Sequence, residues 1–275
     1  MKLLTNDGSE RSYPSYYLYS RLRGRVINGL DYLRRSVPEV ARGYVDREHK
    51  WVYLQMNNRL RDMLWPFFFY REIRRVSEWL RLGDVSSQLE SSLLSEEIKE
   101  IFLESVDITF RVERLETLLS MISKGFKGLK NSFDRKGIKA FEETFMNSFL
   151  SMMSGSVTYP ALREFFRYMI DFRNLMSLYK YIRWNIDTIP LFLLGGNIGK
   201  NELRKALSSG DIFVVNQLFS RRLNIDIDNP SELEVGLYRG LRSILKRRYL
   251  MSPVEPVVIP YYLWNLHVES ILIGL

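Results

Sequence analysis

A glycine-rich stretch ending in lysine is the part of the sequence that comes closest to a chemical motif. Residues 195–201 read Gly-Gly-Asn-Ile-Gly-Lys-Asn. A phosphate-binding P-loop needs a glycine five residues before its Gly-Lys pair, and a serine or threonine after the lysine to hold Mg²⁺. Leu194 and Asn201 stand at those two places. The stretch therefore predicts a glycine turn between helices, and not a nucleotide site.

Two other short motifs lack the companions that their chemistry needs. Ser177 and Lys180 have the S-x-x-K spacing of penicillin-binding enzymes, but S-D-N and K-T-G are absent from the chain. Asp226 and Asp228 begin like a calcium-binding loop, in which Pro230 then occupies a ligand position. We interpret the first pair as surface residues of a helix and the second as part of a helix-capping loop.

Metal, redox and imidazole chemistry have few residues to rest on. The chain has no cysteine, which excludes disulfides and thiolate metal sites and fits a reducing, cytosolic setting. Of the two histidines, we expect His49 to be a surface residue and His267 a hydrogen-bonded structural one, since Glu269 lies on a different side of a helix. No catalytic residue, cofactor or metal ligand is predicted, and the protein is not expected to be an enzyme itself.

Positive charge is the remaining chemical signal. Forty basic residues against 32 acidic ones give a net charge of +8, which favours an acidic protein, a nucleic acid or an anionic membrane surface as a partner. A solvated, arginine-rich surface explains the same balance. Aromatic residues do not alternate with the basic ones as a nucleic-acid stacking platform requires, so nucleic acid is not the expected partner. The candidates for partner contact form three basic clusters: Arg71, Arg74 and Arg75; Arg221 and Arg222; Lys246, Arg247 and Arg248.

Helical periodicity dominates the chain and predicts an all-α, multi-helix fold. The clearest helix covers residues 160–182, with Thr158 as the candidate cap before it. Pro160 suits the first turn, and apolar residues recur every three or four positions. The pattern stops after this segment, and the Gly195-Gly196 pair predicts a turn. Asp171 and Asn174 fall on the face away from the apolar stripe. We therefore expect them to bond to a neighbouring helix or loop.

The same periodicity organises the rest of the chain. Residues 1–12 are polar and expected to be flexible, and residues 13–275 are expected to form a single all-helical domain with sub-units 13–84, 85–156 and 157–275. No apolar run reaches the roughly 18 residues of a membrane span. Further helices are expected over residues 14–37, ended or kinked by Pro38, over 46–81, 95–122, 138–153 and 261–273, with a loop over 124–136.

The long helix and the segment after it carry a resemblance to a known family. The sequence Ile170-Asp171-Phe-Arg-Asn174-Leu175 is followed by Leu193-Leu-Gly-Gly196, and the last helix contains Tyr262 and Glu269 after two prolines. These features resemble the C subunit of V-type and A-type ATPases, called subunit d in eukaryotes. The resemblance is clearest over residues 162–275.

The resemblance implies a funnel built from three similar helical units, without an active site. Such a subunit belongs to the central stalk of a proton- or sodium-translocating ATPase, where it links the central shaft to the membrane rotor ring. It implies the shaft and the ring as partners, and a place at the cytoplasmic face of a membrane without spanning it. Two alternatives stay open: a basic helical adaptor or regulator that binds an acidic protein or nucleic acid, and an enzyme whose site uses carboxylates, tyrosines and lysines.

Overall fold

The structure, a computed structural model, describes residues 3–5, 13–82, 89–104, 106–188, 190–225, 232–253 and 255–273. Over these ranges it contains helices and no strand, which confirms the all-α prediction. The helices are α1 (Ser15–Arg34), α2 (Pro38–Gln55), α3 (Asn58–Arg81), α5 (Glu96–Leu103), α6 (Ile108–Ile122), η1 (Lys124–Phe126), α7 (Leu129–Lys136), α8 (Ile138–Ser156), α9 (Pro160–Arg183), α10 (Lys200–Ser209), α11 (Ile212–Leu218), η2 (Phe219–Leu223), α12 (Glu232–Met251) and α13 (Val258–Leu272).

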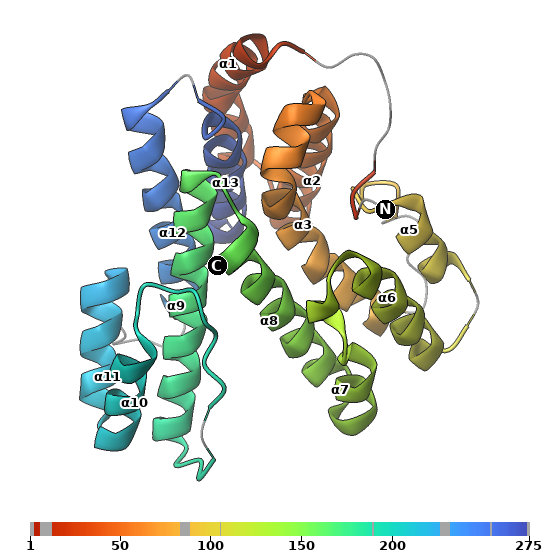
Figure 1. The fold of residues 1–275 in the computed structure, drawn as a ribbon. Helices are drawn as coiled ribbons and strands as arrows, with labels where there is room; N and C mark the ends of the chain where they lie inside the picture. Colours follow the sequence, from red (N-terminus) through yellow and green to blue (C-terminus); the bar gives the residue numbers. More distant parts are fainter. Residues whose placement is uncertain are drawn as a thin grey trace.

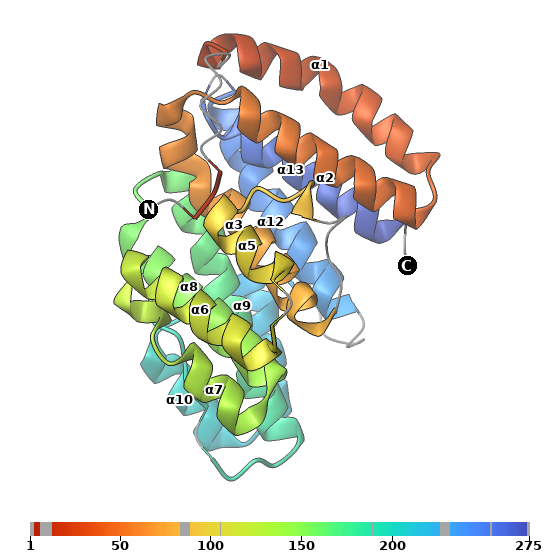
Figure 2. The same cartoon turned by 90° about the vertical axis from the view of Figure 1, so that its right-hand side faces the viewer.

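Two groups of helices descend from a common upper layer (Figure 1). Helices α9 to α12 form one group, α5 to α8 form the other, and α8 packs against both α3 and α9. The upper layer is made from both ends of the chain, because α1 and α2 pack on α13 (Figure 2). None of the helices described here has the combination of length and apolarity that crossing a bilayer needs.

An aromatic junction connects three distant parts of the sequence. The rings of Phe67 on α3, Phe165 on α9 and Trp264 on α13 meet with centroids 5.0 to 6.2 Å apart, and all three side chains are buried. Trp264 also donates its indole N–H to the carbonyl oxygen of Tyr238 on α12 at 3.0 Å. Edge-to-face aromatic contacts add to the free energy of burying these large side chains. Residues 13–275 therefore share one core where they are described, while a division into three similar units stays a prediction.

The N-terminal segment is ordered where the structure describes it. Leu3 and Leu4 are buried, and the backbone of residues 3–5 bonds to residues 93–95: Thr5 N–H donates to the Leu93 carbonyl at 2.7 Å. The expectation of a flexible residue 1–12 segment was therefore wrong for residues 3–5, because two leucines gain burial by this pairing. Residues 1–2 and 6–12 lie outside the described ranges.

Several helix boundaries differ from those that the sequence predicted. The expected helix over residues 95–122 is divided into α5 and α6, and Asp107 caps α6 by accepting the Phe110 N–H at 2.9 Å. The residue at the N-cap position of α9 is Tyr159 and not Thr158.

Pro38 begins α2 instead of only ending the helix before it. The N–H groups in the first turn of a helix have no intrahelical acceptor, so the N–H that proline lacks costs nothing there. The expected helix over residues 46–81 is divided at Asn57, whose side chain accepts a hydrogen bond from the Leu60 N–H at 3.0 Å and caps α3.

The segment 124–136 was expected to be a loop and is mostly helical. It contains η1 and α7, and α7 begins directly after Gly128, which has a left-handed backbone at φ 96°. Glu116 of α6 accepts the N–H groups of Gly128 and Lys130 at 2.8 and 2.6 Å. A carboxylate from a neighbouring helix thus satisfies the first turn of α7, a tertiary contact that local periodicity does not reveal.

Candidate functional site

Asn174 joins α9 to the segment that follows it. Its side-chain amide donates to the carbonyl oxygen of Leu193 at 2.9 Å and accepts the Leu193 N–H at 2.8 Å. The amide thus satisfies both backbone groups of one residue, as a neighbouring strand would. Asn174 is 2% exposed, so this pair of hydrogen bonds is shielded from water.

Asp171, one turn earlier on α9, holds the same segment further along. Its carboxylate accepts the N–H groups of Asn197 and Ile198, each at 2.9 Å, and the Asn197 side-chain amide at 3.0 Å. Burial raises the pKa of Asp171 above its ordinary value, while these donors favour the charged form and oppose the shift. We call Asp171, Asn174, Leu193, Gly196 and Ile198 the α9 clasp.

Gly196 is required by the close approach within the α9 clasp. A Cβ atom at this position would overlap the Asp171 carboxylate, and a Cβ at Gly195 would overlap Ser154 of α8. Gly195 also has a left-handed backbone at φ 95°, which glycine adopts without strain. The predicted glycine turn is therefore confirmed, with steric reasons for both glycines.

The expectation for Asp171 and Asn174 is half correct. Both bond to a neighbouring loop, as predicted. Placing them on a face away from the buried side of α9 was wrong, because the returning segment covers that face and leaves both 2% exposed. All the clasp hydrogen bonds are made within the protein, so these side chains have a packing role.

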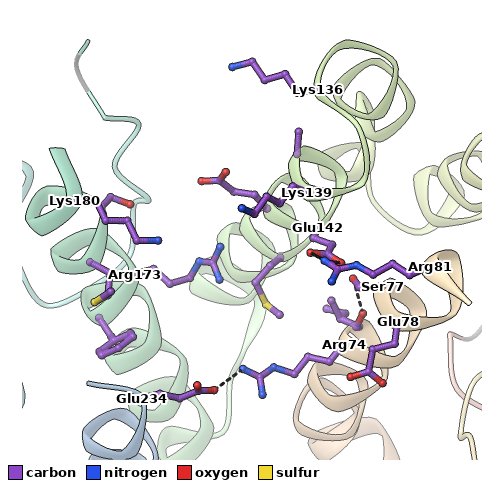
Figure 3. A pocket seen from close by; sticks show the side chains of 17 residues that line it. Arg74, Ser77, Glu78, Arg81, Lys136, Lys139, Glu142, Arg173, Lys180 and Glu234 are labelled. Atoms are coloured by element: carbon purple, nitrogen blue, oxygen red, sulfur yellow. Dashed lines mark hydrogen bonds and ion pairs between the residues drawn. The ribbon is translucent and has the colours of Figure 1, made fainter. Parts of the chain in front are cut away.

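A cleft lies between α3, α8 and α9, with a volume of about 1010 Å³ (Figure 3). Cationic side chains reach it from three sides, and Glu78, Glu142, Glu143 and Glu234 also line it. An apolar part of the wall is formed by Ile73, Met146, Phe172 and Met176. We call this the α3–α8–α9 cleft; its six cationic residues are Arg74, Arg81, Lys136, Lys139, Arg173 and Lys180.

Two arginines of the α3–α8–α9 cleft have carboxylate partners. Arg74 lies 3.6 Å from the carboxylate of Glu234 and donates to the Tyr238 hydroxyl at 2.6 Å. Arg81 pairs with Glu142 at 2.5 Å. These contacts fix α3 to α12 and to α8, which helps to hold the two sides of the cleft at their spacing.

Arg173 of α9 differs from these two because no described carboxylate pairs with it. Its Nε–H donates to the Asn147 side chain at 3.1 Å, and Figure 3 shows its guanidinium reaching into the cleft. Burial lowers the pKa of Arg173, while nearby Glu143 opposes that shift. A desolvated cation with one neutral partner has unsatisfied capacity for hydrogen bonding to an anion.

The first predicted basic cluster is used inside the protein. Arg71 and Arg75 are half-buried and both pair with Asp46 of α2, Arg75 at 2.7 Å. Arg75 also contacts Glu72 at 3.3 Å, and the third member, Arg74, lies in the α3–α8–α9 cleft. Two of these three arginines therefore tie α2 to α3.

The second and third clusters come together, although they are far apart in sequence. Arg221, Arg222 and Arg247 line one cavity of about 650 Å³. Arg222 pairs with Glu202 at 2.9 Å, and Arg247 pairs with Glu164 at 3.2 Å, as does Arg248. Arg221 and Lys246 are exposed and have no ion pair among the described residues. No residue of the first cluster lines this cavity.

The expectation that His49 lies on the surface was wrong. It is 5% exposed, stacks on Phe67, and places Nδ1 2.9 Å from the Val45 carbonyl oxygen. His267 packs between Tyr238 and Trp264, with centroids 5.4 and 5.1 Å away. Burial and the charge of Arg71 lower the pKa of both histidines well below the ordinary value, so both are neutral at pH 7.

Sequence reasoning did not identify the cationic side of α9. Arg173 and Lys180 are seven residues apart, which places them on one face of the helix two turns from each other. That spacing was a usable signal, but each residue alone resembled an ordinary solvated charge. Within the described ranges, no group of three or more His, Asp or Glu residues is arranged to hold a metal ion.

Comparison with known proteins returns no relative from which a role could be transferred. No model of a known protein family matches the chain, and no curated protein sequence matches it. The geometry of the α9 clasp and of the cavities therefore carries the functional argument.

Proposed function

We propose that the protein is a non-catalytic coupling subunit of the central stalk of a V-type or A-type ATPase, which links the central shaft to the membrane rotor ring. One observation carries this proposal. Of the two segments that resemble the family, Ile170–Leu175 is joined to Leu193–Gly196 by the hydrogen bonds of Asn174 to Leu193, and Asp171 binds Asn197 and Ile198 directly after it. A family resemblance made of common residues is better supported when the residues that carry it pack together as one buried unit.

The mechanical build of the protein also supports a coupling role. A subunit that transmits torque has to turn as a body, and a close-packed core resists deformation. Helices from both ends of the chain share a core here, since α1 and α2 pack on α13, and α13 packs on α12. The α9 clasp fixes the returning segment against the middle of α9, a helix of 24 residues.

The exposed basic residues are the candidates for contact with the other ATPase subunits. Arg221, Lys246 and Arg247 face solvent, whereas Arg71 and Arg75 serve α2 and α3 internally. A coupling subunit placed at the cytoplasmic face of the membrane would use the exposed set for its partners. The alternative of a basic adaptor rests on the same eight residues alone, and six of them already have carboxylate partners.

The test is reconstitution with purified ATPase parts from the source organism. The protein is mixed with the central-shaft subunit or with the detergent-solubilised rotor ring, and co-elution is measured by size-exclusion chromatography. We expect a complex with at least one of them, weakened by the triple substitution Arg221→Glu, Lys246→Glu and Arg247→Glu. Arg167→Glu, an exposed residue of α9, is the control. Failure to bind either part, together with tight, salt-sensitive binding to nucleic acid, would overturn the proposal.

A further inference from the structure

The α3–α8–α9 cleft contains more cationic than anionic groups, and its free groups are mostly cationic. Arg74 forms an ion pair with Glu234, and Arg81 forms one with Glu142. Among the described residues, Lys136, Lys139, Lys180 and Arg173 have no ion pair. Two glutamates of the lining, Glu78 and Glu143, are likewise without an ion pair there. The unpaired groups thus leave an excess of positive charge along one open cleft.

The position of these cations suits a compact ligand with several negative charges. Lys139 comes from α8, whereas Arg173 and Lys180 come from the facing helix α9, and Figure 3 shows their side chains extending into the space between. A chain of linked phosphate groups offers several negative charges to the cations of both helices, and the volume of about 1010 Å³ is in the size range of small-molecule sites.

Arg173 is placed and oriented to be the main contact for a bound phosphate group. Its Nε–H is engaged by Asn147, which orients the guanidinium and leaves the two terminal nitrogens for another acceptor. A planar guanidinium binds phosphate through two parallel N–H donors, and such charge-assisted bonds are stronger than neutral ones. Ser177, one turn further along α9, adds a hydroxyl donor to the same wall.

We infer that the α3–α8–α9 cleft is a binding site for a compact polyphosphate anion, with Arg173 as the main contact and Lys139 and Lys180 as supporting cations. This site is independent of the proposed coupling function, which uses other residues. Free inorganic polyphosphate and the phosphate chain of a nucleotide share the chemistry that these residues recognise. The experiment below distinguishes the two sources.

The test is isothermal titration of the full chain with inorganic triphosphate at 50 mM and at 300 mM NaCl. We expect one site per chain, and weaker binding at the higher salt concentration because cationic side chains provide the attraction. Arg173→Gln removes the charge-assisted bonds and should weaken binding about tenfold or more. Lys180→Gln, at an exposed position of α9, should weaken it by a smaller factor. Arg167→Gln, on α9 outside the cleft, is the control and should leave the affinity unchanged.

Competition identifies the source of the phosphate groups. If ATP binds much more tightly than inorganic triphosphate, the ligand is a nucleotide whose base contacts the apolar wall around Phe172 and Met176. Equal affinities identify the phosphate chain alone as the ligand. The inference is overturned if triphosphate does not bind at millimolar concentration, or if Arg167→Gln weakens binding as much as Arg173→Gln. Binding of an acidic peptide in place of triphosphate overturns it as well.

Discussion

Asn174 and Leu193 are 19 residues apart, yet the side chain of the first satisfies both backbone polar groups of the second, at 2.9 and 2.8 Å. A buried backbone group without a partner loses the solvation it has in water. Asn174 is therefore the reason that the segment after α9 can fold back against the helix without a strand or helix of its own. The α9 clasp is a structural joint.

Replacement of Asn174 tests this role directly. Asn174→Leu leaves the N–H and the carbonyl of Leu193 unpaired, and each unsatisfied buried group costs about 1–3 kcal/mol. We expect the free energy of unfolding to fall by about 2 kcal/mol or more in urea titrations. Arg167→Leu, the same kind of replacement at an exposed position of α9, should change it by less than about 0.5 kcal/mol. Loss of a binding activity without loss of stability would contradict a purely structural joint.

The two glycines of the following segment offer a matched steric test. A Cβ at Gly196 would overlap the Asp171 carboxylate, whereas a Cβ at Gly199 meets no atom within 4 Å. Gly196→Ala should therefore lower the free energy of unfolding by about 1–3 kcal/mol, as overpacking does elsewhere. Gly199→Ala should cost less, at most about 1 kcal/mol, because the backbone there is ordinary at φ −68° and only the N-cap position of α10 disfavours alanine. Thermal unfolding of both variants compares them, and equal losses would contradict the steric argument.

Hydrophobic periodicity predicted the positions of the helices well, but it predicted the burial of individual polar side chains less well. The helix over residues 160–182 agrees with α9 within a residue, because one apolar stripe at helical spacing reports local structure. The same reasoning expected Asp171 and Asn174 to bond to a neighbouring helix or loop but put them on the face away from the buried side of α9. It treats one helix at a time, so it does not show that the returning segment buries that face. His49 was misplaced for the same reason: its burial depends on Phe67 of the next helix.

The candidate site shows the same limit. The three basic clusters could be read from the sequence, but their partners could not, because Asp46, Glu164 and Glu202 are distant in sequence from the arginines they pair with. The α3–α8–α9 cleft is formed where three helices diverge, and its central residue, Arg173, belonged to no cluster. Counting charged residues along the sequence gives the net charge. A binding site for an anion depends instead on which cationic side chains remain without a carboxylate partner in the folded protein.

Glu48 provides a prediction about the upper layer. Its side chain is 5% exposed, accepts the Nε–H of Arg25 at 3.1 Å and the hydroxyl of Tyr262 at 2.7 Å, and so joins α1, α2 and α13. Glu48→Gln replaces one acceptor oxygen by a donor and leaves Arg25 without its counter-charge, which should cost about 2 kcal/mol or more. Glu39→Gln makes the same change at an exposed position of α2 and should have a small effect. Urea titration of both variants measures the difference, and similar losses would argue against this link.

The buried His49 and the half-buried His267 predict a loss of stability in mild acid. Both His49 and His267 have a pKa lowered by burial and by the charge of Arg71, so the unfolded chain binds their protons more readily than the folded protein does. Stability is therefore complete above the ordinary histidine pKa of about 6.5 and falls as pH decreases, by up to about 1.4 kcal/mol per pH unit for each histidine. Asp171 acts in the opposite direction, because its pKa is raised in the folded state.

A comparison between variants isolates the histidines from the carboxylates. The free energy of unfolding is measured by urea titration at pH 7.5 and at pH 5.5 for the parent protein and for the double variant His49→Gln/His267→Gln. We expect the parent to lose stability over this interval and the double variant to lose much less, whatever its absolute stability. Carboxylates such as Glu164, whose pKa is lowered by Arg248 and Arg247, contribute only at more acidic pH. Equal pH dependence in the two proteins would show that these histidines are not held neutral by burial.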